Sequence, residues 1–187
     1  MRDADYRGLE GLQELRRKLR SGEEIMARLE LSFDEVQQDP QIRDYFGTEG
    51  LAGARLAESA GMKVYADAVL VDDMGIEGAM WHVEVPDDVA NSIQAMVWDD
   101  QYGMSETLTR STRGPFWQLT RWARDGGPWG HADIHSFEGA FDSSAMASGA
   151  TVGRLRQIVF DDGRVLTREG TTAINPPNDR LKRRLMR

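Results

Sequence analysis

The three histidines of the chain lie in two short segments in which polar and apolar residues alternate. In one segment His131, Asp133 and His135 are separated by single residues, so in a strand their side chains share one face. In the other, His82 and Glu84 share a face for the same reason. Imidazoles and carboxylates together bind zinc, iron or manganese, and a histidine–carboxylate pair also forms a general base with its orienting partner. The five side chains are therefore candidate ligands of a divalent metal.

The same alternation has a plainer interpretation. Residues of one parity in a strand lie about 7 Å apart, so three from one strand rarely reach the same ion. A joint metal site therefore requires the two segments to be neighbouring strands with their polar faces aligned. Without that adjacency, the alternation is that of a half-exposed antiparallel sheet.

Five basic residues fall within the last eight positions, which hold no acidic residue: Arg180, Lys182, Arg183, Arg184 and Arg187. The other 179 residues carry 18 basic and 31 acidic side chains, a formal charge of −13. This asymmetry predicts a basic arm that docks on an acidic partner such as another copy of the chain, or on nucleic acid. The alternative is a solvated helix end, where the helix dipole favours basic residues.

Other chemical motifs are incomplete. The glycine run Gly47–Gly53 lacks the lysine and hydroxyl of a phosphate-binding loop, and no serine lies in a nucleophile elbow. The paired aspartates are typical of solvated turns, because aspartate bonds to its own backbone there. The five tryptophans favour core anchors, with stacking on an aromatic or sugar ligand as the alternative.

The composition is that of one globular domain spanning residues 1–187. The hydrophobic share of 40% is enough for a sizeable core, and the absence of cysteine excludes a disulfide scaffold and a thiolate metal site. The net charge of −8 disfavours an open duplex-DNA-binding surface. No apolar run is long enough for a membrane helix and no signal peptide is recognised, so we expect a cytoplasmic or virion-associated protein with no membrane partner.

The first part of the chain, residues 1–61, has the pattern of successive short helices. Leucines recur at spacings of three and four from Leu9 to Leu19, and Ser21 and Ser32 each begin a capping box. The Ser21 box predicts a helix with Met26 and Leu29 on its apolar side. Further helix signals are Asp39-Pro40 as a start, Gly47 as a stop and Gly61 as a left-handed end.

The second part, residues 62–175, has the pattern of a mostly antiparallel sheet, followed by the basic tail at 176–187. Asp161-Asp162-Gly163 predicts the turn of a C-terminal hairpin. The expected strands are 62–71, 78–85, 129–137, 154–160 and 164–170; 107–113 is expected to be a loop, and 89–98 and 116–123 fit either strand or helix. The fold class is therefore α+β.

Two functions follow from these patterns. The first is a non-catalytic structural or assembly protein, acting as an oligomer or as a component of a larger particle such as a phage virion. Its partners would be its own copies or other protein subunits, with nucleic acid contacted only through the tail; an acidic inhibitor or immunity-type protein belongs to the same class. The second is a small metal-dependent hydrolase, lyase or oxygenase built on the histidine segments. We favour the first, because no complete catalytic signature is present.

Overall fold

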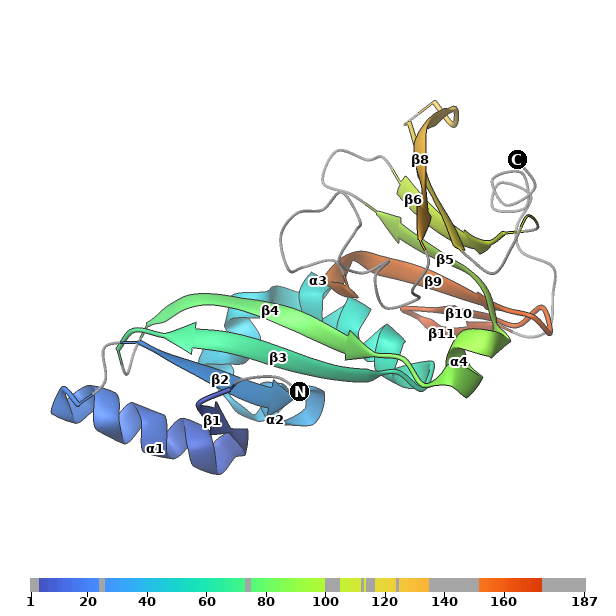
Figure 1. Cartoon of the computed structure of the whole chain (residues 1–187). Coiled ribbons are helices and arrows are strands. Elements are labelled where there is room, and N and C mark those ends of the chain that lie inside the picture. Colours follow the sequence, from blue (N-terminus) through green and yellow to red (C-terminus); the bar gives the residue numbers. More distant parts are fainter. Residues whose placement is uncertain are drawn as a thin grey trace.

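The computed structural model (Figure 1) describes residues 4–23, 26–72, 75–99, 105–111, 113, 117–123, 125–134 and 152–172. For Asp99, Trp129, His131, Ala132, Ile134 and residues 170–172 it describes the backbone alone. Helices and two mostly antiparallel sheets form an α+β fold, as expected. In the part described, no helix has both the length and the apolar character needed to cross a membrane.

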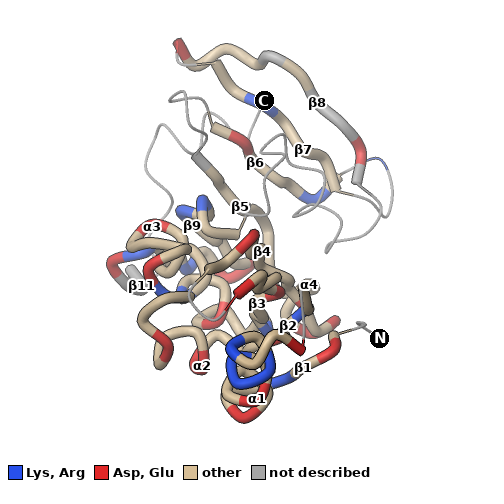
Figure 2. The backbone as a smooth tube through the Cα atoms, turned by 90° about the vertical axis from the view of Figure 1, so that its left-hand side faces the viewer, with Lys and Arg blue, Asp and Glu red and all other residues tan. Residues whose placement is uncertain are grey.

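The first sheet is built from the N-terminal half of the chain. Its strand order is β1-β2-β3-β4, with β1 parallel to β2 and the other pairs antiparallel. The elements are β1 (Tyr6–Arg7), α1 (Gly8–Ser21), β2 (Ala27–Ser32), α2 (Phe33–Gln38), α3 (Pro40–Ser59), β3 (Lys63–Leu70) and β4 (Ile76–Glu84). In Figures 1 and 2, α1 is the lowest element of the molecule.

The second sheet is built from the C-terminal half. Its order is β11-β10-β9-β5-β6-β7-β8, and every described pair is antiparallel. The elements are α4 (Asp87–Ser92), β5 (Ile93–Asp99), β6 (Ser105–Arg110), β7 (Trp117–Trp122), β8 (Pro128–Ile134), the short 3₁₀ turn η1 (Val152–Arg154), β9 (Leu155–Phe160), β10 (Val165–Thr167) and β11 (Gly170–Thr172). The sheets thus follow one another along the chain.

Several helix ends lie where local chemistry predicts them. The Ser32 hydroxyl accepts from the Glu35 N–H, and the Glu35 carboxylate accepts from the Ser32 N–H at 2.9 Å, which completes the capping box. Asp39 caps α3 by accepting from the Ile42 N–H at 3.1 Å. Gly47 interrupts α3 with a φ of 75°, and Gly61 follows its end with a φ of 96°.

The helix predicted to start at Ser21 is wrong. Ser21 is the last residue of α1, where its hydroxyl donates to the Lys18 carbonyl, and Gly22 ends the helix in the left-handed region. The following residues form β2, in which Leu29 lies opposite Ala68 of β3. Pairing with β3, and the burial of one face of β2 that this pairing allows, outweighs the local capping signal.

The loop expected at 107–113 is also wrong, because β6 occupies most of that range. One of its polar residues has a partner within the sheet: the Thr107 hydroxyl accepts from Trp122 Nε1 at 2.8 Å. Two segments fitted either strand or helix. The first, 89–98, holds the end of α4 followed by β5, and the second, 116–123, holds β7. The C-terminal hairpin is confirmed, with Val159 opposite Val165 across a turn in which Gly163 has a φ of 87°.

One hydrophobic core joins both sheets, and α3 lies within it. The cluster of buried side chains draws on α1, α2, α3, both sheets and η1. The ring of Phe46 in α3 stacks on Trp81 of β4 with centroids 3.9 Å apart. Further along α3, a Cβ added to Gly53 would lie within 2.5 Å of the Gly153 carbonyl group in η1 and closer still to the Val152 oxygen. The glycine run of α3 therefore permits close helix packing.

Arg168, which follows β10, holds η1 in its place against α3. Its guanidinium donates from Nε to the Leu155 carbonyl at 2.8 Å and from Nη2 to the Gly153 carbonyl at 2.7 Å, and Nη1 pairs with Glu49 of α3. Only 11% of the Arg168 side chain is exposed, whereas Glu49 is exposed. The two backbone contacts therefore tie η1 and β9 to the residues that follow β10.

Candidate functional site

The first sheet has an apolar inner face and a polar outer face. The buried residues Leu29, Ala68 and Trp81 lie on the inner face, with the helices. Three contacts place the helices on the same side as one another: α1 donates from the Leu9 N–H to Glu35 of α2, and Arg16 of α1 holds Asp39 at the start of α3. These contacts leave the polar face, with Arg28, Tyr65, Asp67, Met80 and His82, on the side of the sheet away from the helices.

His82 and Glu84 lie on this outer face, opposite to Trp81, as the alternation of β4 predicts. His82 is directly across from Tyr65 of β3, and its Nε2 contacts Oδ2 of Asp67. The His82 side chain is 36% exposed and that of Asp67 only 9%. The structure thus brings together a histidine named from the sequence and a carboxylate that was not.

Asp67 lies between two groups that can carry positive charge. Arg28 Nη2 of β2 lies 3.9 Å from the same Oδ2 atom that His82 contacts. A carboxylate with so little exposure is costly unless such partners compensate for its lost hydration. If Nε2 donates to the carboxylate, Nδ1 of the neutral ring is the acceptor. This arrangement orients an imidazole as in a general base.

A signal for Asp67 exists in the sequence. It is the one charged residue inside a run of valine, alanine and leucine, and the turn at Asp72 aligns β3 with β4 as a hairpin. Placing Asp67 beside His82 requires the hairpin register, which pairs Asp67 with Met80 and Tyr65 with His82. Parity and register together therefore predict the contact.

The second histidine segment lies in the other sheet. His131 and Asp133 belong to β8, where they are opposite Thr120 and Gln118 of β7, while His82 belongs to β4, at the edge of the first sheet. Asp133 is exposed; the His131 side chain and the whole of His135 are outside the described residues. The two segments therefore do not share a sheet face. Within the described part, no three histidine, aspartate or glutamate side chains are grouped to hold a metal ion.

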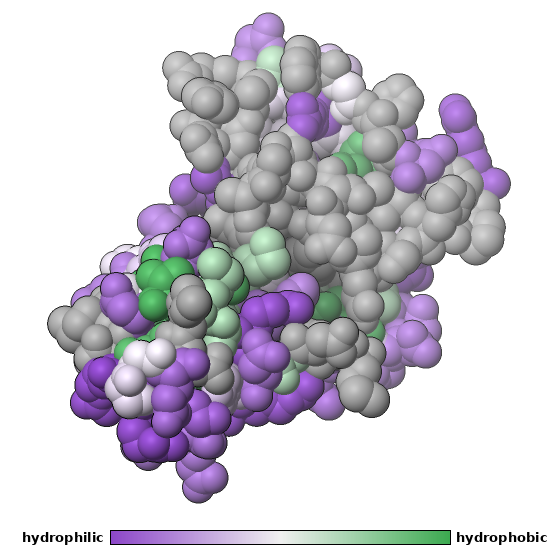
Figure 3. Space-filling model, turned by 60° about the vertical axis from the view of Figure 1, so that its left-hand side comes forward, coloured by the Kyte–Doolittle hydropathy of each residue, from purple (hydrophilic) through white to green (hydrophobic). Residues whose placement is uncertain are grey.

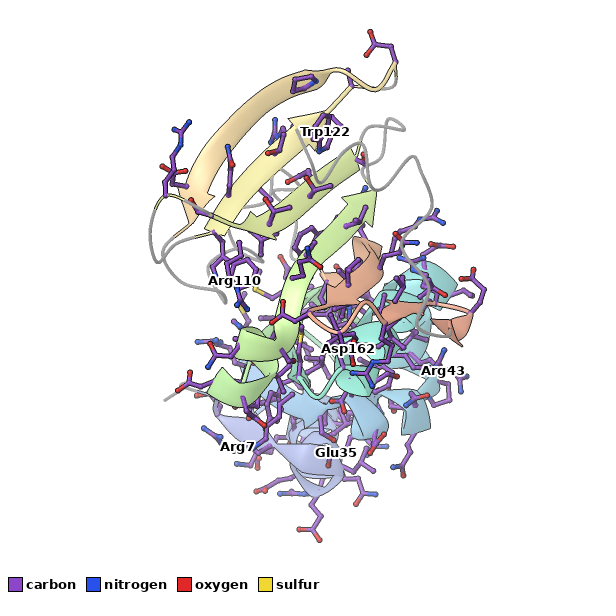
Figure 4. All side chains as sticks on the ribbon, turned by 90° about the vertical axis from the view of Figure 1, so that its right-hand side faces the viewer. Arg7, Glu35, Arg43, Arg110, Trp122 and Asp162 are labelled. Carbon is purple, nitrogen blue, oxygen red and sulfur yellow. The ribbon has the colours of Figure 1, made fainter. Side chains whose placement is uncertain are left out.

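A groove of 770 Å³ lies between α1 and β1. Its wall includes Asp5, Glu10, Glu14 and Lys18, with Tyr6 and Met26 as the large apolar side chains. Figure 3 shows hydrophilic side chains gathered at the lower end of the molecule, where α1 lies. Arg7, labelled near this end in Figure 4, also lines the groove and pairs with Glu30 at 3.4 Å.

The basic residues predicted to bind a partner, Arg180, Lys182, Arg183, Arg184 and Arg187, lie outside the described residues. Comparison of the chain with protein-family models, with curated proteins and with solved structures finds no match. Arguments about function therefore rest on the residues and their geometry.

Proposed function

We propose that the protein is a non-catalytic assembly component that works as a homo-oligomer or within a larger particle such as a phage virion. The observation that carries this proposal is the opposite charge of the tail and the rest of the chain. The last eight residues hold five basic side chains, while the other 179 residues have a formal charge of −13. Acidic residues lie on both the lower, helix-bearing part and the upper sheet in Figure 2.

Opposite charges on two parts of one chain favour association between copies. Complementary potentials steer the encounter and penalise wrong partners, and salt screens them over about 10 Å at 0.1 M. Association of this kind is strongest at low ionic strength. The same physics applies if the acidic partner is another protein subunit of the particle, which would give a mixed assembly.

The test is the mass of the purified, untagged protein in solution, measured by light scattering at low and high salt. We expect an oligomer at low salt that shifts toward monomer when Arg183→Glu and Arg184→Glu are combined. The control combines Arg17→Glu with Arg113→Glu; it makes the same change in net charge at exposed positions outside the tail. An oligomer mass that is unchanged by the tail variant, or a monomer under all conditions, contradicts the proposal.

The pairing of His82 with Asp67 supports a second candidate, a small enzyme. The carboxylate orients the imidazole, which is the arrangement of a general base. A zinc, iron or manganese ion held by His131, Asp133 and His135 is a separate, metal-dependent form of this candidate, at a place in the other sheet. Elemental analysis tests the metal form: about one ion per chain, lost in His131→Ala without unfolding, supports it. A metal content below about a tenth of an ion per chain in protein purified without chelators contradicts it.

A further inference from the structure

The groove between α1 and β1 offers carboxylates that are incompletely paired. Within the described residues, Glu10 makes no ion pair. Glu14 lies 3.7 Å from Lys18, and its side chain is 54% exposed, so this pair is weak. Asp5 accepts one backbone N–H, from Arg28, through Oδ2. Three carboxylates can therefore accept further donors from a cationic ligand.

The wall of the groove is mostly polar, and Met26 and Tyr6 are its large apolar side chains. Met26 is 58% exposed, the highest value among the large hydrophobic side chains that the structure describes as exposed. Tyr6 contributes its ring, over which Lys18 lies at 5.3 Å from the centroid. A ligand that fits both features is an amphipathic basic peptide, with apolar side chains for Met26 and Tyr6 and cations for the carboxylates.

The C-terminal segment of the chain has this character. Leu181 and Leu185 are four residues apart, the spacing that aligns side chains on one helix face, and basic residues occupy most of the positions around them. The described residues end at β11, which lies to the right of centre in Figure 1, whereas α1 lies at the lower left. This separation favours insertion of the segment from a neighbouring copy over insertion from the same chain.

We propose that the groove between α1 and β1 binds the segment Arg180–Arg187 of a neighbouring copy. The inference rests on the proposed self-assembly and names the surface through which it occurs. Glu10, Glu14 and Asp5 receive the basic side chains, and the exposed Met26 receives a leucine. Because each copy has one groove and one segment, the contact is head-to-tail and joins copies into a ring or a filament.

The absence of cysteine from the chain allows a direct test by disulfide formation. One preparation carries Met26→Cys and the other Leu185→Cys with a mass tag, so a mixed disulfide must join two copies. Tyr45→Cys in place of Met26→Cys is the matched control, because Tyr45 is also a large exposed hydrophobic residue, at 49% exposure, and lies outside the groove. We expect the mixed disulfide from the groove position to exceed the control at least about fivefold.

Charge reversal gives a second readout. Glu10→Arg combined with Glu14→Arg is expected to weaken low-salt self-association about tenfold, and mixing this variant with the Arg183→Glu, Arg184→Glu variant is expected to restore association. An oligomer that forms normally but shows no preference for the groove cysteine overturns the groove assignment and leaves the assembly proposal intact. A chain that is monomeric at every salt concentration overturns both.

Discussion

Replacement of Gly53 by alanine tests how α3 is held within the core. A glycine-to-alanine change in the interior of a helix ordinarily stabilises it, because alanine has less backbone freedom to lose. At this position the new Cβ would lie within 2.5 Å of the Gly153 carbonyl carbon and oxygen. These are backbone atoms, so no side-chain rotation can relieve the contact.

The net effect on stability can be worked out from these two contributions. Overpacking against a well-packed neighbour costs up to about 3 kcal/mol, and the upper end applies because the atoms in the way are backbone atoms of η1. The gain in helix propensity is about 1 kcal/mol. We therefore expect Gly53→Ala to lower the free energy of unfolding by about 2 kcal/mol, or the melting temperature by about 4–8 °C.

The assay is urea unfolding followed by tryptophan fluorescence, with the denaturant slope checked for constancy. Gly50→Ala is the matched control on the same helix, because its Cβ would meet Phe46 Cβ at 3.3 Å and Trp81 Nε1 at 3.8 Å, contacts that need only small shifts. We expect this control to stay within about 1 kcal/mol of the parent chain. The reasoning is refuted if Gly53→Ala is as stable as Gly50→Ala.

Three further outcomes are expected. Burial raises the pKa of Asp39, but hydrogen bonds from Arg16 and the Ile42 N–H and the positive charge of Arg16 outweigh it and lower the pKa overall. Its stabilising contribution is therefore complete well above the ordinary aspartate pKa and is lost as the pH falls through the lower folded value, a fall that Asp39→Asn should flatten in urea titrations. Arg168→Met should cost about 2 kcal/mol in the same assay. Ser32→Ala should cost about 1 kcal/mol by loss of the capping box.

The elements that could be predicted from the sequence are those whose stabilising contacts are local. The Ser32 capping box and the Asp39 cap are completed within three residues. The hairpin turn depends on the positive φ of Gly163 itself. The strands β2 and β6 were missed because their stability comes from partners elsewhere in the chain. A polar residue such as Thr107 makes a strand look like a loop in the sequence, because the hydrogen bond that it makes across the sheet cannot be read there.

In the candidate site, too, the features that depend on one strand could be predicted and those that depend on several strands could not. The alternation in β4 correctly placed His82 and Glu84 on the face opposite Trp81, since side-chain parity is a property of a single strand. The contact of His82 with Asp67 depends on the register between two strands. The separation of His82 from His131 depends on which sheet each strand joins, and that assignment is decided by the packing of the whole domain.

The packing of Gly53 against Gly153 also has a consequence for how the chain folds during synthesis. About a hundred residues separate the two glycines, so α3 leaves the ribosome long before the turn that covers it. At bacterial or eukaryotic translation speeds this interval is roughly 5 to 20 s. Throughout it, the glycine face of α3 remains open to solvent and to chaperones. A nascent chain that stalls before η1 emerges therefore exposes part of its core, which makes it a substrate for quality control.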